Sequence, residues 1–176
     1  MITLVPITPQ NAMLFKAVRL QALQESPGAF GSTYAGESRF SDAEWSQRIE
    51  RWSGDKGIGF LAMDLTLPCG MAGGLLDEDH PRQVQLVSMW IAPAHRRQGV
   101  GRLLVNEVLS WARGQAAETL TLMVTSGNEA AIRFYERLGF VQTGRTEPYE
   151  NDLDWVKYEM AMAIIRPGRG LGGRQP

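Results

Sequence analysis

The sequence has very little of the residues on which disulfide, zinc and thiol chemistry depend. Cys69 is its one cysteine, and His80 and His95 are its two histidines. One cysteine excludes an intrachain disulfide and is typical of a reducing compartment, while two histidines without a cysteine partner do not form a usual zinc site. We therefore expect no metal, and we expect Cys69 to lie in the core rather than act as a nucleophile.

Long apolar runs and lysines are also scarce. No apolar run approaches the ~20 residues that span a bilayer, and residues 1–6 lack the features of a signal peptide. The net charge of −1 provides no global field for nucleic acid or an anionic membrane. These absences predict a cytoplasmic protein that binds neither nucleic acid nor membrane. Fifteen of the 18 basic residues are arginine, which favours bidentate contacts with anions over lysine nucleophile chemistry.

Hydrophobic periodicity predicts one domain over residues 1–165, followed by a disordered tail over 166–176 that has little to bury. The expected strands are 2–6, 58–64, 70–76, 83–92, 118–125, 140–145 and 155–163, and the expected helices are 9–25, 41–52, 99–113 and 128–138. The consecutive strands before residue 92 predict antiparallel neighbours. The strand–helix–strand unit from 83 to 125 should instead be parallel and right-handed.

A basic, glycine-containing turn follows the strand 83–92. Val87, Met89 and Ile91 alternate with Ser88 and Trp90 in that strand, and Pro93 should end it. The turn, residues 96–101, reads Arg-Arg-Gln-Gly-Val-Gly and opens a helix. Uncovered amides and the positive dipole at a helix start favour a phosphate, and neighbouring arginines add forked donors. The turn lacks the Gly-Lys-[Ser/Thr] of a P-loop and the three glycines of a dinucleotide turn.

A second pattern accompanies this turn. Residues 128–140 place Asn128, Phe134, Tyr135, Gly139 and Phe140 at fixed spacings on one predicted helix and its end. Together the two segments resemble the GNAT superfamily of acetyl-CoA-dependent N-acetyltransferases, most strongly over 83–163. The resemblance implies an α+β, three-layer fold, with a mixed, mostly antiparallel sheet of about seven strands and helices on both faces.

The resemblance also implies where acetyl-CoA lies. The donor should sit where the strands 83–92 and 118–125 splay apart, with its acetyl carbonyl and pantetheine arm on the first strand and its pyrophosphate on the turn. Its expected binding residues are Met89, Trp90, Ile91, Arg96, Arg97, Gln98, Gly99, Val100, Gly101, Arg102, Asn128, Ala131 and Tyr135.

Tyr135 is where the family places the general acid that protonates the leaving thiolate. A phenol of pKa about 10 can donate a proton while remaining neutral at pH 7. The alternative is that Tyr135 is only a core aromatic.

The general base is less defined, because the strand before the turn carries no carboxylate. Glu37 and Glu78 are the predicted catalytic carboxylates, with Asp77 and His80 as alternatives. Ser88 could instead position a water. The alternative for Glu37, Glu78, Asp77 and His80 is that each is a solvated loop residue without a catalytic role.

The sequence predicts an enzyme that moves an acetyl group to a primary amine by direct attack in a ternary complex. The amine could belong to a small molecule or to a protein. The segment 29–37 is the predicted wall of the acceptor pocket, with Phe30, Tyr34 and Glu37 facing it. The alternative is that this segment is an ordinary loop between helices. Homodimerisation is expected by resemblance. The alternatives are a catalytically silent acyl-CoA sensor of the same fold and, more remotely, a nucleotide-binding protein.

Overall fold

The computed structural model describes residues 1–164, so the predicted tail 166–176 lies outside the described residues. The strands are β1 (Ile2–Pro6), β2 (Gly57–Asp64), β3 (Leu67–Leu76), β4 (Gln83–Ile91), β5 (Thr119–Thr125), β6 (Val141–Pro148) and β7 (Val156–Ala163). The helices are α1 (Ala12–Glu25), α2 (Tyr34–Glu37), α3 (Asp42–Ser53), α4 (Val100–Gly114) and α5 (Glu129–Leu138), with short 3₁₀ turns η1 (Pro9–Asn11), η2 (Pro27–Ala29) and η3 (Pro93–His95).

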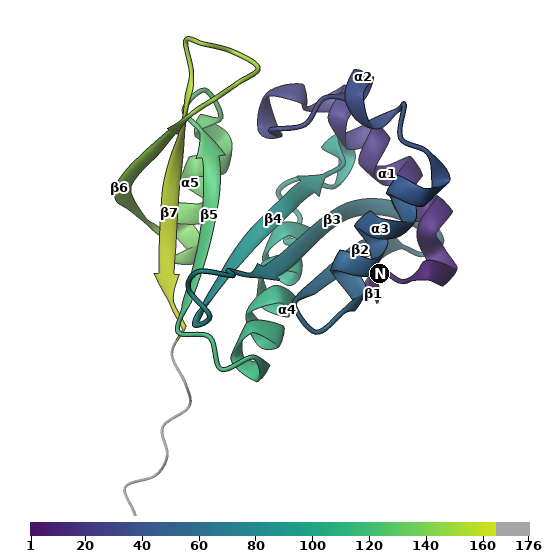
Figure 1. Ribbon diagram of the computed structural model, residues 1–176, viewed down its shortest axis with the longest axis horizontal. Coiled ribbons are helices and arrows are strands. Elements are labelled where there is room, and N and C mark those ends of the chain that lie inside the picture. The colour runs from purple at the N-terminus through teal and green to yellow at the C-terminus, as the bar shows by residue number, and fades with distance from the viewer. Residues whose placement is uncertain (165–176) are drawn as a thin grey trace, which may run out of the picture.

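These elements form one seven-stranded sheet in the order β1-β2-β3-β4-β5-β7-β6. The pair β4–β5 is parallel and the other pairs are antiparallel. Helices α1 and α3 pack on one face, and α4 and α5 pack on the other (Figure 1). The predicted fold class is therefore confirmed. The core on the α4 face includes Cys69, which is fully buried as expected.

Local signals account for most element ends. Ser41 and Glu44 form a capping box at the start of α3, and Gly139 ends α5 with a φ of +99°. Two connections differ from the expectation. The segment 29–37 contains the one-turn helix α2, because the Thr33 hydroxyl caps it. The connection between β2 and β3 is shorter than expected, because β3 begins at Leu67 and not at residue 70.

Strand β4 contains a β-bulge at Ser88. Gly73 pairs with Val87 and Met71 pairs with Trp90, so Ser88 and Met89 together oppose a single residue of β3. Ser88 has a φ of +54°, in the left-handed region that costs a residue other than glycine roughly 1 kcal/mol or more. The simple alternation expected along β4 is therefore wrong. Val87 packs toward α1 and α3, whereas Met89 packs toward α4.

The two parallel strands separate soon after they meet. Only residues 83–85 of β4 pair with residues 119–121 of β5. Beyond this point the strands diverge toward the start of α4, as Figure 1 shows. The backbone of β4 from residue 88 onward thus has no partner from β5, which leaves its peptide groups on that side available to a ligand.

Candidate active site

The turn between β4 and α4 has the geometry of an anion site. Arg97 and Gly99 adopt positive φ values of +62° and +83°, and Gly99 caps the helix. The first bond into the helix runs from the Leu103 amide to the Gly99 carbonyl at 3.1 Å. The amides of residues 100–102 precede that bond and have no acceptor within the helix, so they can donate to a bound anion.

The three arginines of this turn are used differently. Arg96 donates from Nε to the Ile91 carbonyl at 3.0 Å and from Nη2 to Glu25 at 2.5 Å. Arg97 and Arg102 are exposed, and neither forms an ion pair with any residue in the part of the chain that the structure describes. Arg96 therefore holds the turn in shape, while Arg97 and Arg102 retain free donors.

Glu25, the last residue of α1, joins the turn to β4. Its Oε2 accepts hydrogen bonds from Trp90 Nε1 at 3.0 Å, from Arg96 and from the Ser26 hydroxyl. Burial opposes ionisation of this carboxyl, but these three hydrogen bonds outweigh it and lower its pKa. Glu25 thus remains a carboxylate that ties three elements together beside the separated strands.

Helix α5 approaches the turn closely. A Cβ on Gly101 would lie 2.9 Å from the Phe134 ring and 3.2 Å from Met89 Cε, so only glycine fits at that position without a shift. Asn128 caps α5 by accepting from the Ala131 amide at 3.2 Å. The structure therefore brings Met89 of β4 and Gly101 of the turn together against Phe134 of α5, while Asn128 and Ala131 form the cap of that helix.

Tyr135 lies in this helix and is buried, with 7% of its surface exposed. Its ring contacts Phe134 and Phe140, at centroid distances of 5.2 and 5.6 Å. Within the described residues its hydroxyl has no hydrogen-bond partner. Burial raises the pKa of Tyr135 above its ordinary value, so the phenol is neutral at pH 7 and is a weaker acid than a solvent-exposed phenol.

The segment around η2 bridges the upper end of the gap between β4 and β5. Thr125, at the end of β5, donates to the Gly28 carbonyl at 2.8 Å. The Trp155 ring leaves no room for a Cβ on Gly28 or Gly127, where the contacts would be 2.9 and 2.3 Å. Tyr149 stacks on Trp155 and donates to the carbonyl of Phe30 at 2.9 Å.

A hollow of about 290 Å³ lies between this bridge and the β6–β7 connection. Aromatic and polar side chains line it, among them Tyr34, Tyr149, Asn151, Asp152 and Trp155. Tyr34 is 40% exposed, as a wall of an open pocket would be, while Phe30 is buried under the bridge.

Glu37 does not face that hollow as a free carboxylate. It is 1% exposed, and both of its oxygens accept from Arg19, at 2.7 and 2.9 Å. Arg48 lies 3.0 Å from the same carboxylate. Burial opposes its ionisation, but the two arginines outweigh this and lower the pKa of Glu37. Such a carboxylate is a poor proton acceptor at neutral pH, which argues against the predicted role as a base.

The other predicted carboxylate, Glu78, lies at the wrong end of β4. It belongs to the connection between β3 and β4, with Asp77 and His80, where its exposed side chain lies 3.6 Å from Lys56. Residues 84 and 90 of β4 are roughly 20 Å apart at strand spacing. Figure 1 shows β4 running from this hairpin toward α4. The position of Glu78 therefore argues against a role as the base.

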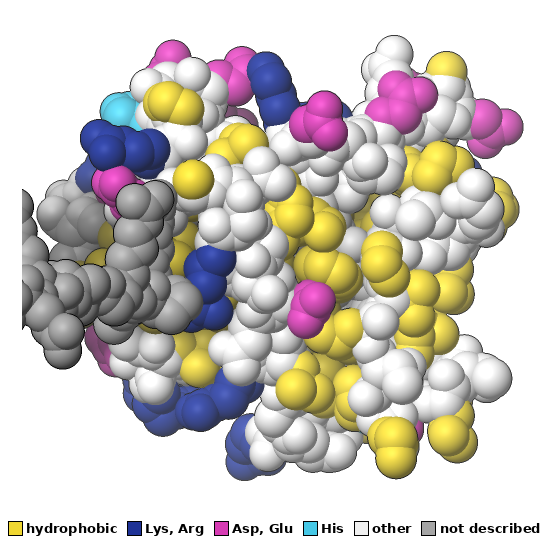
Figure 2. Space-filling view, turned by 90° about the horizontal axis from the view of Figure 1, so that it is seen from below, with side chains coloured by type: hydrophobic (Ala, Val, Ile, Leu, Met, Phe, Trp, Pro, Cys, Tyr) yellow, Lys and Arg dark blue, Asp and Glu magenta, His cyan; other side chains and the backbone are white. Residues whose placement is uncertain are grey.

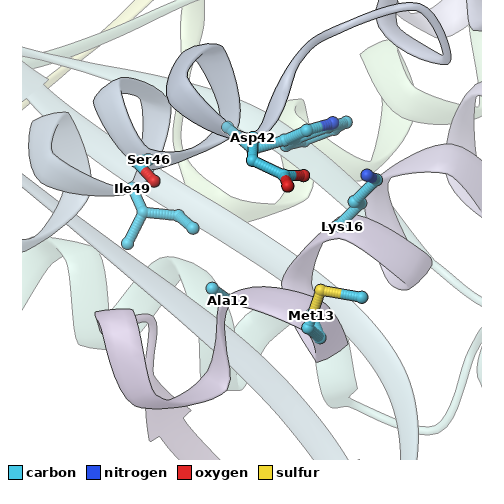
Figure 3. Close-up of a pocket in the computed structure, with 7 residues that line it drawn as sticks. Ala12, Met13, Lys16, Asp42, Ser46 and Ile49 are labelled. Atoms are coloured by element: carbon cyan, nitrogen blue, oxygen red, sulfur yellow. The ribbon is translucent and has the colours of Figure 1, made fainter.

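A second hollow, of about 120 Å³, lies between α1 and α3 (Figure 3). Lys16 and Asp42 point toward one another across it, above Ala12 and Met13. Both helices lie on the face opposite α4, so this hollow is separate from the turn. Among residues 1–164 no group of three or more His, Cys, Asp or Glu side chains is placed to hold a metal ion.

Figure 2 shows basic side chains in separate small groups, most of them on the left of that view. Most of the exposed hydrophobic side chains lie on the right. None of the helices in the described part of the chain has both the length and the apolar character needed to cross a membrane.

The sequence reasoning missed Arg19 and Glu25. A signal for Arg19 was present, because it falls on the buried stripe of α1 with Phe15, Val18 and Ala22. A charged residue on such a stripe requires a buried partner. Glu25 carried no comparable signal, since its partners Trp90 and Arg96 are far away in the sequence.

Comparisons with known proteins agree with this geometry. The model of the "Acetyltransferase (GNAT) family" matches residues 21–140. The chain is 31% identical over 102 residues to a probable N-acetyltransferase family 8 member 5 of Mus musculus, which covers 56% of this chain but 43% of that protein. The chain thus spans less than half of that mouse relative.

Other relatives match over more of their length. The chain is 27% identical over 133 residues to the [ribosomal protein bS18]-alanine N-acetyltransferase of Escherichia coli K12, covering 76% of this chain and 88% of that protein. Its fold is similar to that of a GNAT acetyltransferase of Streptococcus pneumoniae, with a TM-score of 0.79, 22% identity, and coverage of 94% and 100%. The chain belongs to the GNAT family of acetyltransferases.

Proposed function

We propose that this chain transfers the acetyl group of acetyl-CoA to a primary amine by direct attack in a ternary complex. The observation that carries the proposal is that the gap between β4 and β5 opens beside the free amides at the start of α4, against which Phe134 packs next to the buried Tyr135. Family membership supports the same activity.

The residues of the turn fit the donor's pyrophosphate. The amides of residues 98–102 and the free guanidinium groups of Arg97 and Arg102 would hold its oxygens. Arg96 contributes by holding the turn against Ile91 and Glu25. The unpaired backbone of residues 89–91 would receive the pantetheine arm and the acetyl carbonyl. Asn128, which caps α5, would contact the pantetheine arm.

The reaction forms one C–N bond and breaks one C–S bond. The bound ammonium first loses a proton to water, because only a neutral amine has a lone pair. That lone pair then attacks the thioester carbon, and backbone donors of β4 stabilise the developing oxyanion. As the C–S bond breaks, the Tyr135 hydroxyl gives its proton to the leaving thiolate. The nitrogen then loses its extra proton to water, and Tyr135 is reprotonated from solvent. Water takes the role of general base that was predicted for Glu37 and Glu78. Glu37 is paired with two arginines, and Glu78 lies at the opposite end of β4 from the turn.

The acceptor would enter through the hollow beside the η2 bridge. Its aromatic walls, Tyr34, Tyr149 and Trp155, and the nearby acid Asp152 suit an amine that carries positive charge. A small amine and a protein amino group both meet this description. A cytoplasmic location, homodimerisation and the absence of nucleic-acid and membrane partners stay predictions.

The test is thiol release from acetyl-CoA across a panel of small amines and peptide amino groups. Replacing Tyr135 by phenylalanine should lower kcat by about 10²-fold or more, because a general acid typically contributes that much. Tyr158→Phe is the matched control, since Tyr158 packs against the same core from β7, and it should keep its rate within about twofold.

Calorimetry separates the main alternative from this proposal. An enzyme binds acetyl-CoA and releases thiol with at least one amine. Tight binding without release across the panel would instead identify a silent acyl-CoA sensor. A wild-type rate in Tyr135→Phe would remove Tyr135 as the acid.

A further inference from the structure

The buried Arg19 contacts strand β4 as well as Glu37. Its Nε and Nη2 fork onto the two Glu37 oxygens, and its Nη1 donates to Ser88 Oγ at 3.4 Å. The Phe30 ring lies 4.7 Å from the guanidinium carbon. The fork and the ring together determine the plane of the guanidinium group, so the direction of its third nitrogen toward Ser88 is set as well.

Ser88 is the residue that forms the bulge of β4. Its backbone holds a φ of +54°, which a serine adopts only when its surroundings stabilise it. The bulge changes the direction of every later side chain of β4, so that Met89 and Ile91 pack toward the α4 core and Trp90 reaches Glu25. The same residues, 89–91, are those whose backbone has no partner on β5.

Burying the charges of this cluster costs desolvation free energy. Arg19 is 3% exposed and Glu37 is 1% exposed, and Arg48 adds a second cation to the same carboxylate. Buried ion pairs often stabilise a fold no better than apolar side chains of similar size. A role in geometry accounts for this cluster better than a role in stability.

We propose that Arg19 is a positioning residue for acetyl transfer. Its hydrogen bond to Ser88 holds the bulge of β4, and the bulge directs the backbone of residues 89–91 into the gap between β4 and β5. The kinetic consequence rests on the proposed function, whereas the effect on the bulge does not.

The first experiment compares two variants of the same ion cluster. Arg19→Lys keeps a charge for Glu37 but cannot reach Ser88 at the same time, and its kcat should fall about tenfold, with the KM for acetyl-CoA within about twofold. Arg48→Lys is the control, because Arg48 contacts Glu37 but not Ser88, and its kcat should stay within about twofold. Equal losses in the two variants would overturn the proposal.

The second experiment tests whether Arg19 acts through Ser88. Glycine adopts a positive φ freely, so Ser88→Gly keeps the bulge without the hydrogen bond. In the Ser88→Gly background, Arg19→Lys should change kcat by less than about twofold, measured relative to Ser88→Gly alone. A further tenfold loss would show that Arg19 acts independently of Ser88.

The third experiment uses the substrate-free protein and needs no activity. Amide hydrogen exchange at residues 87–91 should become about tenfold faster in Arg19→Lys, while exchange in β2 and throughout Arg48→Lys stays near the wild-type rate. Unchanged exchange at 87–91 would refute the role of Arg19. Faster exchange in a chain that acetylates no amine would support the effect of Arg19 on the bulge and refute the proposed function.

Discussion

Two groups of arginines flank strand β4, and the protein uses them in opposite ways. Arg19 and Arg48 lie on the α1 and α3 side, where they share the buried carboxylate of Glu37. Arg97 and Arg102 lie at the start of α4, exposed and without ion pairs among the described residues. The residue type is the same, but the first group is paired with a buried carboxylate and the second keeps its donors for a ligand.

The comparison shows that burial, more than residue type, separates a structural charge from a binding charge. Arg96 stands between the groups, because it belongs to the exposed turn and yet is held by Glu25 and Ile91. If this distinction is correct, removing a buried charge should affect folding, and removing an exposed one should affect only donor binding.

The largest effect is expected at the buried group. Glu37→Ala should reduce the free energy of unfolding by about 3–5 kcal/mol, because it leaves two arginines without their partner. Urea unfolding measures this. Glu118→Ala is the control, since its pair with Arg82 is largely exposed and should be worth less than about 1 kcal/mol. Similar losses in both variants would erase the distinction between the two groups.

At the exposed group we expect an effect on binding alone. Replacing Arg97 and Arg102 together by alanine should raise the KM for acetyl-CoA about tenfold or more, because a hydrogen bond to a charged group is worth about 1.5–3 kcal/mol. The free energy of unfolding should change by less than about 0.5 kcal/mol. Arg113→Ala, at the far end of α4, is the control. A wild-type KM in the double variant would argue against donor binding at this turn.

Glu25 offers an intermediate case. Glu25→Gln keeps the side-chain shape but weakens the hold on Arg96, which still has the Ile91 carbonyl. We expect the KM for acetyl-CoA to rise by about threefold, measured at saturating amine. Glu107→Gln, an exposed position of α4, should leave KM unchanged. An effect on kcat alone would place Glu25 in the chemical step instead.

The smallest expected effect is a change in the free energy of unfolding at acidic pH. The pKa of Glu37 in the folded protein lies below its ordinary value of 4.5, because the arginines outweigh the opposing effect of burial. The ionised group therefore stabilises the fold above that value, and this contribution is lost as the pH falls through the folded-state pKa. The stability difference between wild type and Glu37→Gln should narrow from about pH 7 to about pH 3. A constant difference would contradict the ion pairing.

The sequence by itself determined the local parts of the site. The glycine-containing turn that opens α4 and Gly139 at the end of α5 act through their own backbone and near neighbours, so spacing alone predicted both. The same holds for the strand–helix–strand unit, because a helix between two adjacent strands makes them parallel.

Tertiary structure decided the rest, since it depends on partners distant in the chain. The bulge at Ser88 has Arg19 beside it, 69 residues earlier, and it reverses the facing of Met89 that alternation would give. Strand β7 lies between β5 and β6 in the sheet, and hydrophobic periodicity does not predict the order of strands in a sheet. The sequence allowed Glu37 to be a free base, because it does not show which charges lie beside a residue. The tertiary structure places Arg19 and Arg48 against the Glu37 carboxylate.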